Sequence, residues 1–335
     1  MKSSARMSLV VGSLVASVGW WSAPTLAASF ADLPPDWGEV ALLNDRLRVR
    51  APKAAEPAPP GFGLMEAPAA PEHRLRLIID SGPLRLVALV AELFRVSPGG
   101  LAQLGPAFLK TIGEDRRIGS LSVEPSATGA DGLEVLEYEP RGAVKLGDAN
   151  FIRGVLTKLP DGTVQSINFF VNDPALADLP AARRLIADMI ASLKPGSRPL
   201  LTGMRAQPPG GTLTLDLLPG YTAYWQRGPD FDVYWIEHLV PLNQPSGRLG
   251  IYSGHHPQRG RHPDNARMQR VVLFGVAAQW YVWEGPANLT NAPRFFLEAF
   301  VPESGTRLMR HVFLEAITAA ESADFQRMAE SATFQ

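Results

Sequence analysis

A strand–turn–strand–helix unit that occurs twice is the feature that most constrains how this chain can fold. The first copy, GVLTKLPDGTVQSINFFVND, runs from Gly154 to Asp173 and precedes the helix-like run AARRLIADMIASL. The second copy, FFLEAFVPESGTRLMRHVFLEA, runs from Phe295 to Ala316 and precedes ADFQRMAESAT. In each copy an apolar strand ends at a proline, an acidic turn with Gly-Thr follows, and a second apolar strand leads towards a helix. We therefore expect an internal duplication.

The segments around the two copies extend the repeat. The helix after the first copy, about residues 180–194, carries an apolar stripe and is stopped by a Pro-Gly pair. Its ending, Ile-Ala-Ser-Leu at 190–193, is similar to the Ala-Glu-Ser-Ala ending of the last helix at 329–332. The pattern predicts an α+β fold with two duplicated domains, each an antiparallel β-sheet with packed helices. Their expected limits are 28–194 and 212–335, with a proline-containing linker at 195–211.

Apolar–polar alternation predicts most strands of both domains. Besides the strands of the repeated units, we expect strands at 43–52, 73–80, 118–123 and 133–138, and then at 212–218, 231–239, 248–252 and 271–283. The apolar run 84–94 fits either a buried strand or a helix. Ser97 and the proline after it favour a helix that ends at Gly113, and Ser322 is expected to cap the last helix.

Residues 51–71, APKAAEPAPPGFGLMEAPAAP, form a proline-rich insertion in the first domain. Prolines at 52, 57, 59, 60, 68 and 71 exclude a helix or a central strand. We expect an extended surface loop. The alternative is a proline-rich ligand for a partner.

The first residues have the pattern of a secretory signal peptide. Lys2 and Arg6 precede an apolar run from Met7 to Trp21, and small residues allow cleavage after Ala27. The run is shorter than the roughly 20 residues that a membrane-spanning helix needs, so no stable span is expected after cleavage. An uncleaved anchor is the alternative. The sequence thus predicts a periplasmic or secreted protein.

Charge and cysteine content exclude several classes of function. The net charge of −1 shows no excess of positive charge of the kind that nucleic-acid-binding proteins use. The absence of cysteine excludes disulfides, thiol catalysis and cysteine–zinc sites. The sequence also lacks G-x-S-x-G, H-E-x-x-H, a P-loop and a dinucleotide fingerprint, and no cofactor is predicted.

The order of strands, turns and closing helix resembles the PsbP-like superfamily. The residues that carry the resemblance are LRVRAP at 47–52, PDGTVQSINFF at 160–170 and MIASL at 189–193, with their counterparts in the second half. That group includes DcrB-like periplasmic proteins and some immunity proteins of type VI secretion systems. The resemblance covers most of both halves and implies binding rather than catalysis. It transfers no functional residue to this chain.

A loop rich in histidine and arginine is one candidate site. Residues 254–263, GHHPQRGRHP, contain His255, His256, Arg259, Arg261 and His262. Imidazoles bind zinc, and three with an open fourth position suit a catalytic metal. However, adjacent histidines diverge, no carboxylate has a matching spacing, and the arginines repel cations. The set therefore suits an anion or an acidic partner better than a metal. A plain polar loop is the remaining interpretation.

Aromatic residues are dense between Tyr221 and Trp283. Along a strand Trp280 points to one side, and Tyr281 and Trp283 point to the other. Both sides therefore carry large rings, which can serve as core or as a binding platform. We include Trp280, Tyr281 and Trp283 in the candidate partner surface.

These features predict a noncatalytic exported binding protein that engages a protein partner or a small anionic ligand through its second domain. An immunity protein that blocks a toxin is the specific form implied by the family resemblance. One alternative is a metal-dependent hydrolase that uses His255, His256 and His262. Another is a structural envelope-assembly module that engages its partner through the proline-rich insertion.

Overall fold

The computed structural model describes residues 29–33, 36–53, 55–58, 74–113, 120–128, 130–146, 149–257, 262–287, 290–303 and 308–335. The predicted signal peptide and most of the proline-rich insertion lie outside these ranges. The described chain forms two compact units. The first contains residues 29–199 and 241–243, and the second contains residues 200–240 and 244–335. The boundary after Pro199 falls within the stretch expected to be a linker. No helix in the described ranges is long and apolar enough to cross a membrane.

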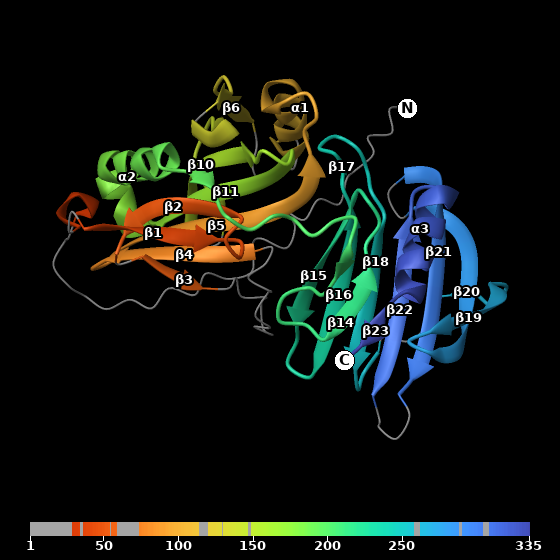
Figure 1. Cartoon of the computed structure of the whole chain (residues 1–335). Coiled ribbons are helices and arrows are strands. Elements are labelled where there is room, and N and C mark those ends of the chain that lie inside the picture. Colours follow the sequence, from red (N-terminus) through yellow and green to blue (C-terminus); the bar gives the residue numbers. More distant parts are fainter. Residues whose placement is uncertain are drawn as a thin grey trace. The chain divides into compact units, whose positions relative to one another are not determined.

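The first unit is built on a large antiparallel sheet with the strand order β3-β4-β5-β11-β10-β8-β6 (Figure 1). The strands are β3 (Ala55–Ala58), β4 (Arg74–Ser81), β5 (Leu84–Val96), β6 (Leu121–Val123), β8 (Glu134–Pro140), β10 (Ala149–Lys158) and β11 (Thr163–Asn172), with the short β7 (Ala127–Thr128) and β9 (Val144–Leu146) beside them. A small sheet joins β1 (Trp37–Leu42), β2 (Leu47–Pro52) and β12 (Lys194–Pro195). The helical elements are η2 (Phe30–Asp32), α1 (Leu101–Gly113), η3 (Ala130–Gly132), η4 (Asp173–Asp178) and α2 (Leu179–Ala191).

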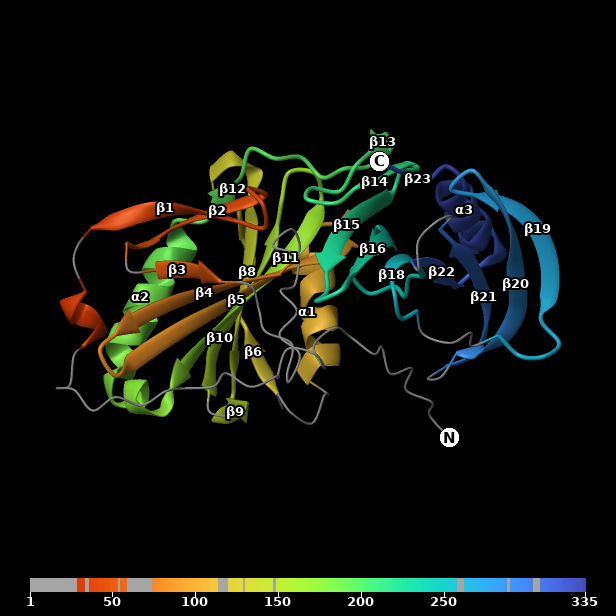
Figure 2. The same cartoon turned by 90° about the horizontal axis from the view of Figure 1, so that it is seen from below.

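The two helices of the first unit cover opposite faces of its large sheet. The apolar stripe of α2, including Leu185, Ile186 and Met189, packs into the core formed with one face of the sheet and with β2. Helix α1 packs on the other face. There an added Cβ at Gly105 would lie 2.3 Å from Leu136 Cδ2, so only a glycine permits this approach. The two helices lie well apart in both views of the unit (Figures 1 and 2).

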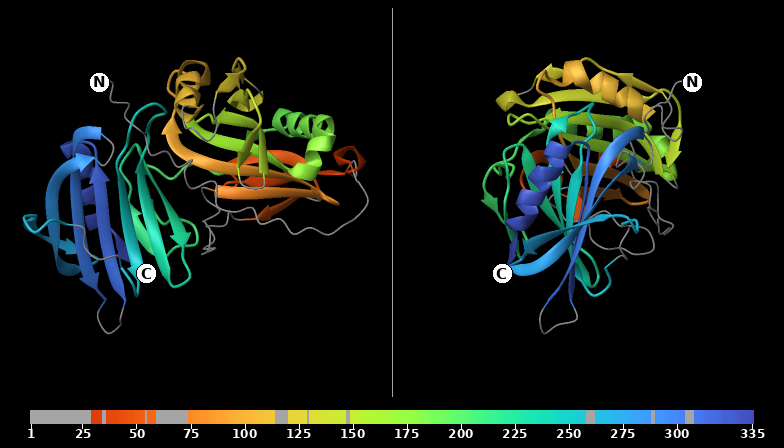
Figure 3. Two further views of the ribbon diagram at one scale, coloured as in Figure 1. Left: turned by 180° about the vertical axis from the view of Figure 1, so that it is seen from behind. Right: turned by 90° about the vertical axis from the view of Figure 1, so that its right-hand side faces the viewer.

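The second unit has a large antiparallel sheet with the order β15-β16-β18-β22-β21-β20-β19. The strands are β15 (Tyr221–Arg227), β16 (Phe231–His238), β18 (Arg248–Gly254), β19 (Arg267–Leu273), β20 (Val276–Ala287), β21 (Thr290–Pro302) and β22 (Met309–Ala316), and the chain also contains β17 (Val240–Pro241). Shorter pairings join β13 (Arg205–Ala206), β14 (Leu213–Asp216) and β23 (Thr333–Phe334). Helix α3 (Ala319–Glu330) lies against the strands (Figure 3) and buries Phe325, Met328 and Ala329 in the core.

Equivalent serines end the last helix of each unit. The Ser192 hydroxyl donates to the carbonyl of Met189 at 2.7 Å, and its oxygen accepts the Arg50 N–H of β2 at 2.8 Å. The Ser331 hydroxyl donates to the carbonyl of Met328 at 2.7 Å, and its oxygen accepts the Asp216 N–H of β14 at 2.9 Å. In both units the serine therefore ties the end of the helix to an early strand.

The run 84–94, whose sequence fits either a strand or a helix, is a strand. Other sequence-based expectations need correction. Residues Ala55–Ala58 of the insertion, expected to lie in a surface loop, form the edge strand β3. The strand expected over 271–283 is a hairpin, because Phe274 and Gly275 adopt φ of 54° and 77° and turn the chain back. Strand β15 was not predicted. Thr318, not Ser322, caps α3, because its hydroxyl accepts the Glu321 N–H at 3.1 Å.

Candidate functional site

One face of the large sheet in the second unit is lined by half-buried aromatic side chains. Leu297, Ala299 and Val301 of β21 point into the core with α3, so the residues between them point to the opposite side. The same alternation holds on the neighbouring strands. We call this side the open face and define it by Trp235, Tyr281, Trp283, Phe296, Phe300 and Phe313.

No helix among the described residues of the second unit covers the open face, whereas a helix covers a face of the sheet in the first unit. There α1 lies between β5 and β6 in the sequence and packs on β8 and β10, next to Leu136 and Leu156. In the second unit the connection between β18 and β19 contains no helix in its described residues, 255–257 and 262–266. This connection is the histidine- and arginine-rich loop. Large aromatic side chains therefore remain partly accessible on this sheet.

The rings of the open face pack against one another in pairs. Trp283 stacks on Phe296 with ring centroids 5.4 Å apart and an interplanar angle of 12°. Trp235 meets Phe313 edge to face at 5.5 Å, and the guanidinium of Arg248 lies 4.8 Å from the Trp235 ring centroid. Such pairs hold the rings in fixed orientations, which lowers the entropy lost when a partner binds them.

A buried carboxylate–imidazole pair lies in the middle of the open face. Oε1 of Glu298 is 2.7 Å from Nε2 of His311, and the two residues are 2% and 5% exposed. The imidazole stacks on Phe300 with centroids 4.3 Å apart and also contacts Phe313. The aromatic rings shield the imidazole from solvent, so a substrate reaches it only if they move. The contact gives each of these buried polar groups a hydrogen-bond partner, and the imidazole packs against the surrounding rings.

The three histidines of the predicted loop, which are its described site residues, do not converge on one point. His255 and His256 are exposed, with ring centroids 6.4 Å apart, and the His256 N–H donates to Tyr252 Oη at 3.0 Å. His262 instead stacks on Tyr281 of the open face at 4.0 Å and 7°. Arg259 and Arg261 lie outside the described residues. Within the described part of the chain, no group of three histidine, aspartate or glutamate side chains could hold a metal ion.

The three aromatic residues predicted for the partner surface separate into two environments. Tyr281 and Trp283 are half-buried on the open face. Trp280 belongs to the core and is 0% exposed. Its inclusion in the partner surface was therefore wrong, because its strand position faces α3. Phe296, Phe313 and Trp235 were not predicted as site residues. Only the pairing of the strands places Phe296 beside Trp283 and Phe313 beside Trp235 on the same face.

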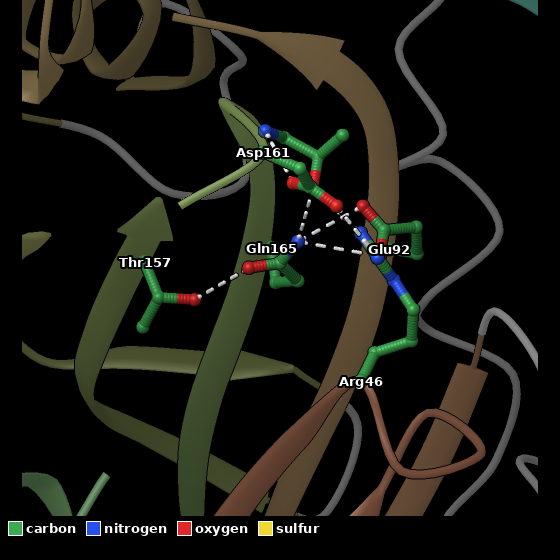
Figure 4. A network of polar contacts seen from close by, with 6 residues as sticks. Arg46, Glu92, Thr157, Asp161 and Gln165 are labelled. Atoms are coloured by element: carbon green, nitrogen blue, oxygen red, sulfur yellow. Dashed lines mark hydrogen bonds and ion pairs between the residues drawn. The ribbon is translucent and has the colours of Figure 1, made fainter. Parts of the chain in front are cut away.

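The first unit contains a buried polar network that the sequence did not reveal (Figure 4). Arg46 donates from Nε to Glu92 at 3.3 Å, from Nη1 to Asp161 at 2.8 Å and from Nη2 to Thr163 at 2.6 Å. Gln165 donates to both oxygens of Glu92 at 3.1 and 3.2 Å. Burial raises the pKa of Glu92, although Arg46 and Gln165 oppose that rise. The network joins the β1–β2 turn, β5 and the β10–β11 turn, and Arg46 and Glu92 are only 6% and 5% exposed.

Glu321 has a comparable structural role in the second unit. It is 5% exposed, accepts the N–H of Gly247 at 3.0 Å and of Ile317 at 2.6 Å, and lies 2.8 Å from Nδ1 of His238. Burial by itself raises the pKa of Glu321, but the hydrogen bonds from His238, Ile317 and Gly247 together lower it below its ordinary value. The ionised carboxylate therefore stabilises the fold.

Replacing Glu321 by glutamine is expected to lower the free energy of unfolding by about 2 kcal/mol at neutral pH, because an amide cannot satisfy the same donors. The folded-state pKa lies below the unfolded one, so this contribution is present above the unfolded pKa and is lost as pH falls through the folded pKa. The difference between the variant and the parent should thus shrink in acid. Urea unfolding at several pH values measures it, with the exposed Glu330→Gln as control. A difference that stays constant down to strong acid contradicts this role.

Comparisons with known proteins give a limited result. No protein-family model and no curated protein matches this sequence. The structure is similar to the solution structure of cyanobacterial PsbP (CyanoP) from Synechocystis sp. PCC 6803, with a TM-score of 0.30 and 11% identity over 53% of this chain and 98% of that chain. It is also similar to the apo structure of TplEi, a type VI secretion immunity protein from Pseudomonas aeruginosa, with a TM-score of 0.23 and 10% identity over 89% of this chain and 97% of that chain. The chain thus has a weak structural resemblance to a PsbP protein and to an immunity protein.

Proposed function

We propose that this chain is a noncatalytic, exported binding protein that engages a protein partner through the open face of its second unit. The observation that carries the proposal is the row of half-buried aromatic rings on a sheet face over which the described residues place no helix. Aromatic side chains are enriched at the centres of protein interfaces, where they provide large contact areas at low entropic cost. The cleavable-signal pattern of the first residues supports export as part of the proposal.

A duplication explains why the two units differ at this place. We attribute both units to one ancestral domain, and their strand orders support this. We number the seven strands on the main path of each large sheet in chain order and leave out the short side strands β7, β9 and β17. Both sheets then have the spatial order 1-2-3-7-6-5-4. Pairing of β12 with β2 corresponds to pairing of β23 with β14, and Ser192 and Ser331 occupy equivalent places. In this scheme the position of α1 corresponds to the histidine-rich loop. One copy then has a helix at this place and the other has the loop above an aromatic sheet face.

A capture experiment tests the proposal. The mature protein is immobilised and exposed to envelope extract from its source bacterium, in parallel with a Tyr281→Ala/Trp283→Ala variant. We expect the parent to retain a defined protein, and the variant to lose most of it, because truncating two large aromatic residues of this face removes a large share of the binding energy. An Ala320→Ser/Glu330→Ala variant on the exposed side of α3 is the matched control.

The control variant should retain the same protein as the parent, and circular dichroism should show that both variants are folded. Equal retention by the parent, the open-face variant and the control argues against this surface. A toxin is the kind of partner that the sequence resemblance implies. Inhibition of the captured protein's activity by the parent, and not by the open-face variant, would support that narrower form.

A further inference from the structure

Strand β19 forms one edge of the large sheet in the second unit. In the described part of the chain it pairs with β20 alone, so its other side presents unpaired backbone N–H and C=O groups. An edge of this kind is a template on which an extended segment can add as a further strand. The strand runs over seven residues, from Arg267 to Leu273.

The exposed side chains distinguish β19 from the other edge strands of the two large sheets. Met268 and Val272 are 64% and 59% exposed. The opposite edge of the same sheet, β15, begins with three buried residues. In the first unit the edge strand β3 has four residues and contains Pro57, and β6 has three residues. Short length and proline protect an edge from pairing, and β19 has neither.

The charges on β19 favour one kind of added strand. Arg267 and Arg270 are exposed and have no hydrogen-bond or ion-pair partner among the described residues. Arg270 lies between Met268 and Val272 on the open-face side, and Arg267 points to the other side. The β20 residues that face β19, 276–282, carry no charge. Two copies of β19 placed side by side would bring arginines together, which is unfavourable.

From these observations we infer that β19 binds an extended acidic segment of the partner by strand addition. The segment carries one acidic residue opposite Arg270, flanked two positions away on each side by apolar residues that cover Met268 and Val272. A second acidic residue faces Arg267. Because Met268 pairs with Tyr281 of the open face, the added strand would continue that surface outward. The inference deepens the proposed function by naming the chemistry of the partner at this edge.

Synthetic peptides test this directly. The probe is a fluorescent six-residue peptide, valine-valine-glutamate-threonine-valine-glutamate, with both ends blocked, and its binding to the full chain is measured by anisotropy. We expect saturable binding, weakened about tenfold or more, or roughly 1.4 kcal/mol, in an Arg267→Glu/Arg270→Glu variant. The same peptide with lysine in place of glutamate should bind that variant better than the parent.

Strand addition also requires hydrogen bonds between the backbones of the peptide and β19. Two further peptides carry N-methyl groups on alternate residues, one at odd and one at even positions. Strand addition predicts that one pattern abolishes binding and the other largely preserves it, since only alternate N–H groups face β19. Absence of binding at millimolar peptide, equal binding of the glutamate and lysine peptides, or insensitivity to both methylation patterns overturns the inference. Because this assay contains no envelope protein, its failure leaves the capture result on the open face unaffected.

Discussion

Replacing Arg46 by alanine is expected to lower the free energy of unfolding of the first unit by about 3–5 kcal/mol, since it leaves a buried carboxylate without its cation. Glu92 would lose its ion pair, while Gln165 would be its remaining hydrogen-bond donor. Hydrogen–deuterium exchange in urea, followed in peptides from β5 and β11, measures the stability of the first unit separately from that of the second. This matters because a chain of two units need not unfold in one step.

The loss should depend on pH. The folded-state pKa of Glu92 is already raised by burial, and removal of the guanidinium raises it further. A raised pKa in the folded state gives stability that is full below the unfolded pKa and is lost as pH rises through the folded pKa. Arg46→Ala should therefore be less damaging in mild acid than at neutral pH. Adding Glu92→Gln should recover part of the stability.

The matched control is Arg50→Ala, which removes an exposed arginine from β2 and is expected to change stability by less than about 0.5 kcal/mol. An equal loss in both arginine variants, or no recovery in the double variant, contradicts the role assigned to the buried network.

The second large effect concerns two tryptophans on one strand. Trp280→Ala should destabilise the second unit by about 3–5 kcal/mol, because it removes a fully buried ring from the core. Trp283→Ala should cost about 1 kcal/mol, because its ring is only half-buried and stacks on Phe296 outside the core. Chemical denaturation monitored by exchange of peptides from β20–β22 measures both.

The two tryptophan positions should rank in the opposite order in their effect on partner binding. A Trp280→Phe variant keeps most of the core volume and should retain the partner in the capture experiment. Trp283→Ala should weaken retention while leaving the protein folded. Similar stability losses for both alanine variants would mean that the two faces of β20 are not distinct.

The sequence predicted the elements better than their environments. Alternation located β4, β16 and β22, and the matching ends of α2 and α3 led to Ser192 and Ser331, whose hydrogen bonds are the same. Strand β15 was missed because Tyr, Thr, Ala, Tyr and Trp succeed one another without clear alternation. The hairpin at Phe274 was missed because a left-handed phenylalanine has no strong sequence signal.

The candidate site was only half predictable. The period of two correctly separated Trp280 from Tyr281 and Trp283, but local sequence does not say which side meets the helix. That choice depends on α3, almost forty residues further along the chain. The network around Arg46 could not be predicted from the sequence either, because it joins three segments that are distant in sequence. A lone glutamate in the apolar run of β5, Glu92, was the one available hint.

The closing strands bear on the order in which the protein folds. Strand β12 pairs with β2 and β23 pairs with β14, so each unit joins an early strand to its last one. In an exported protein of the kind proposed, the N-terminal part of the chain crosses the membrane first, and domains usually fold in the order in which they emerge. The first unit can then close its small sheet once Pro195 has crossed, while Thr333 and Phe334 are still to follow. The order of emergence thus separates in time two similar sheets that could otherwise exchange their closing strands.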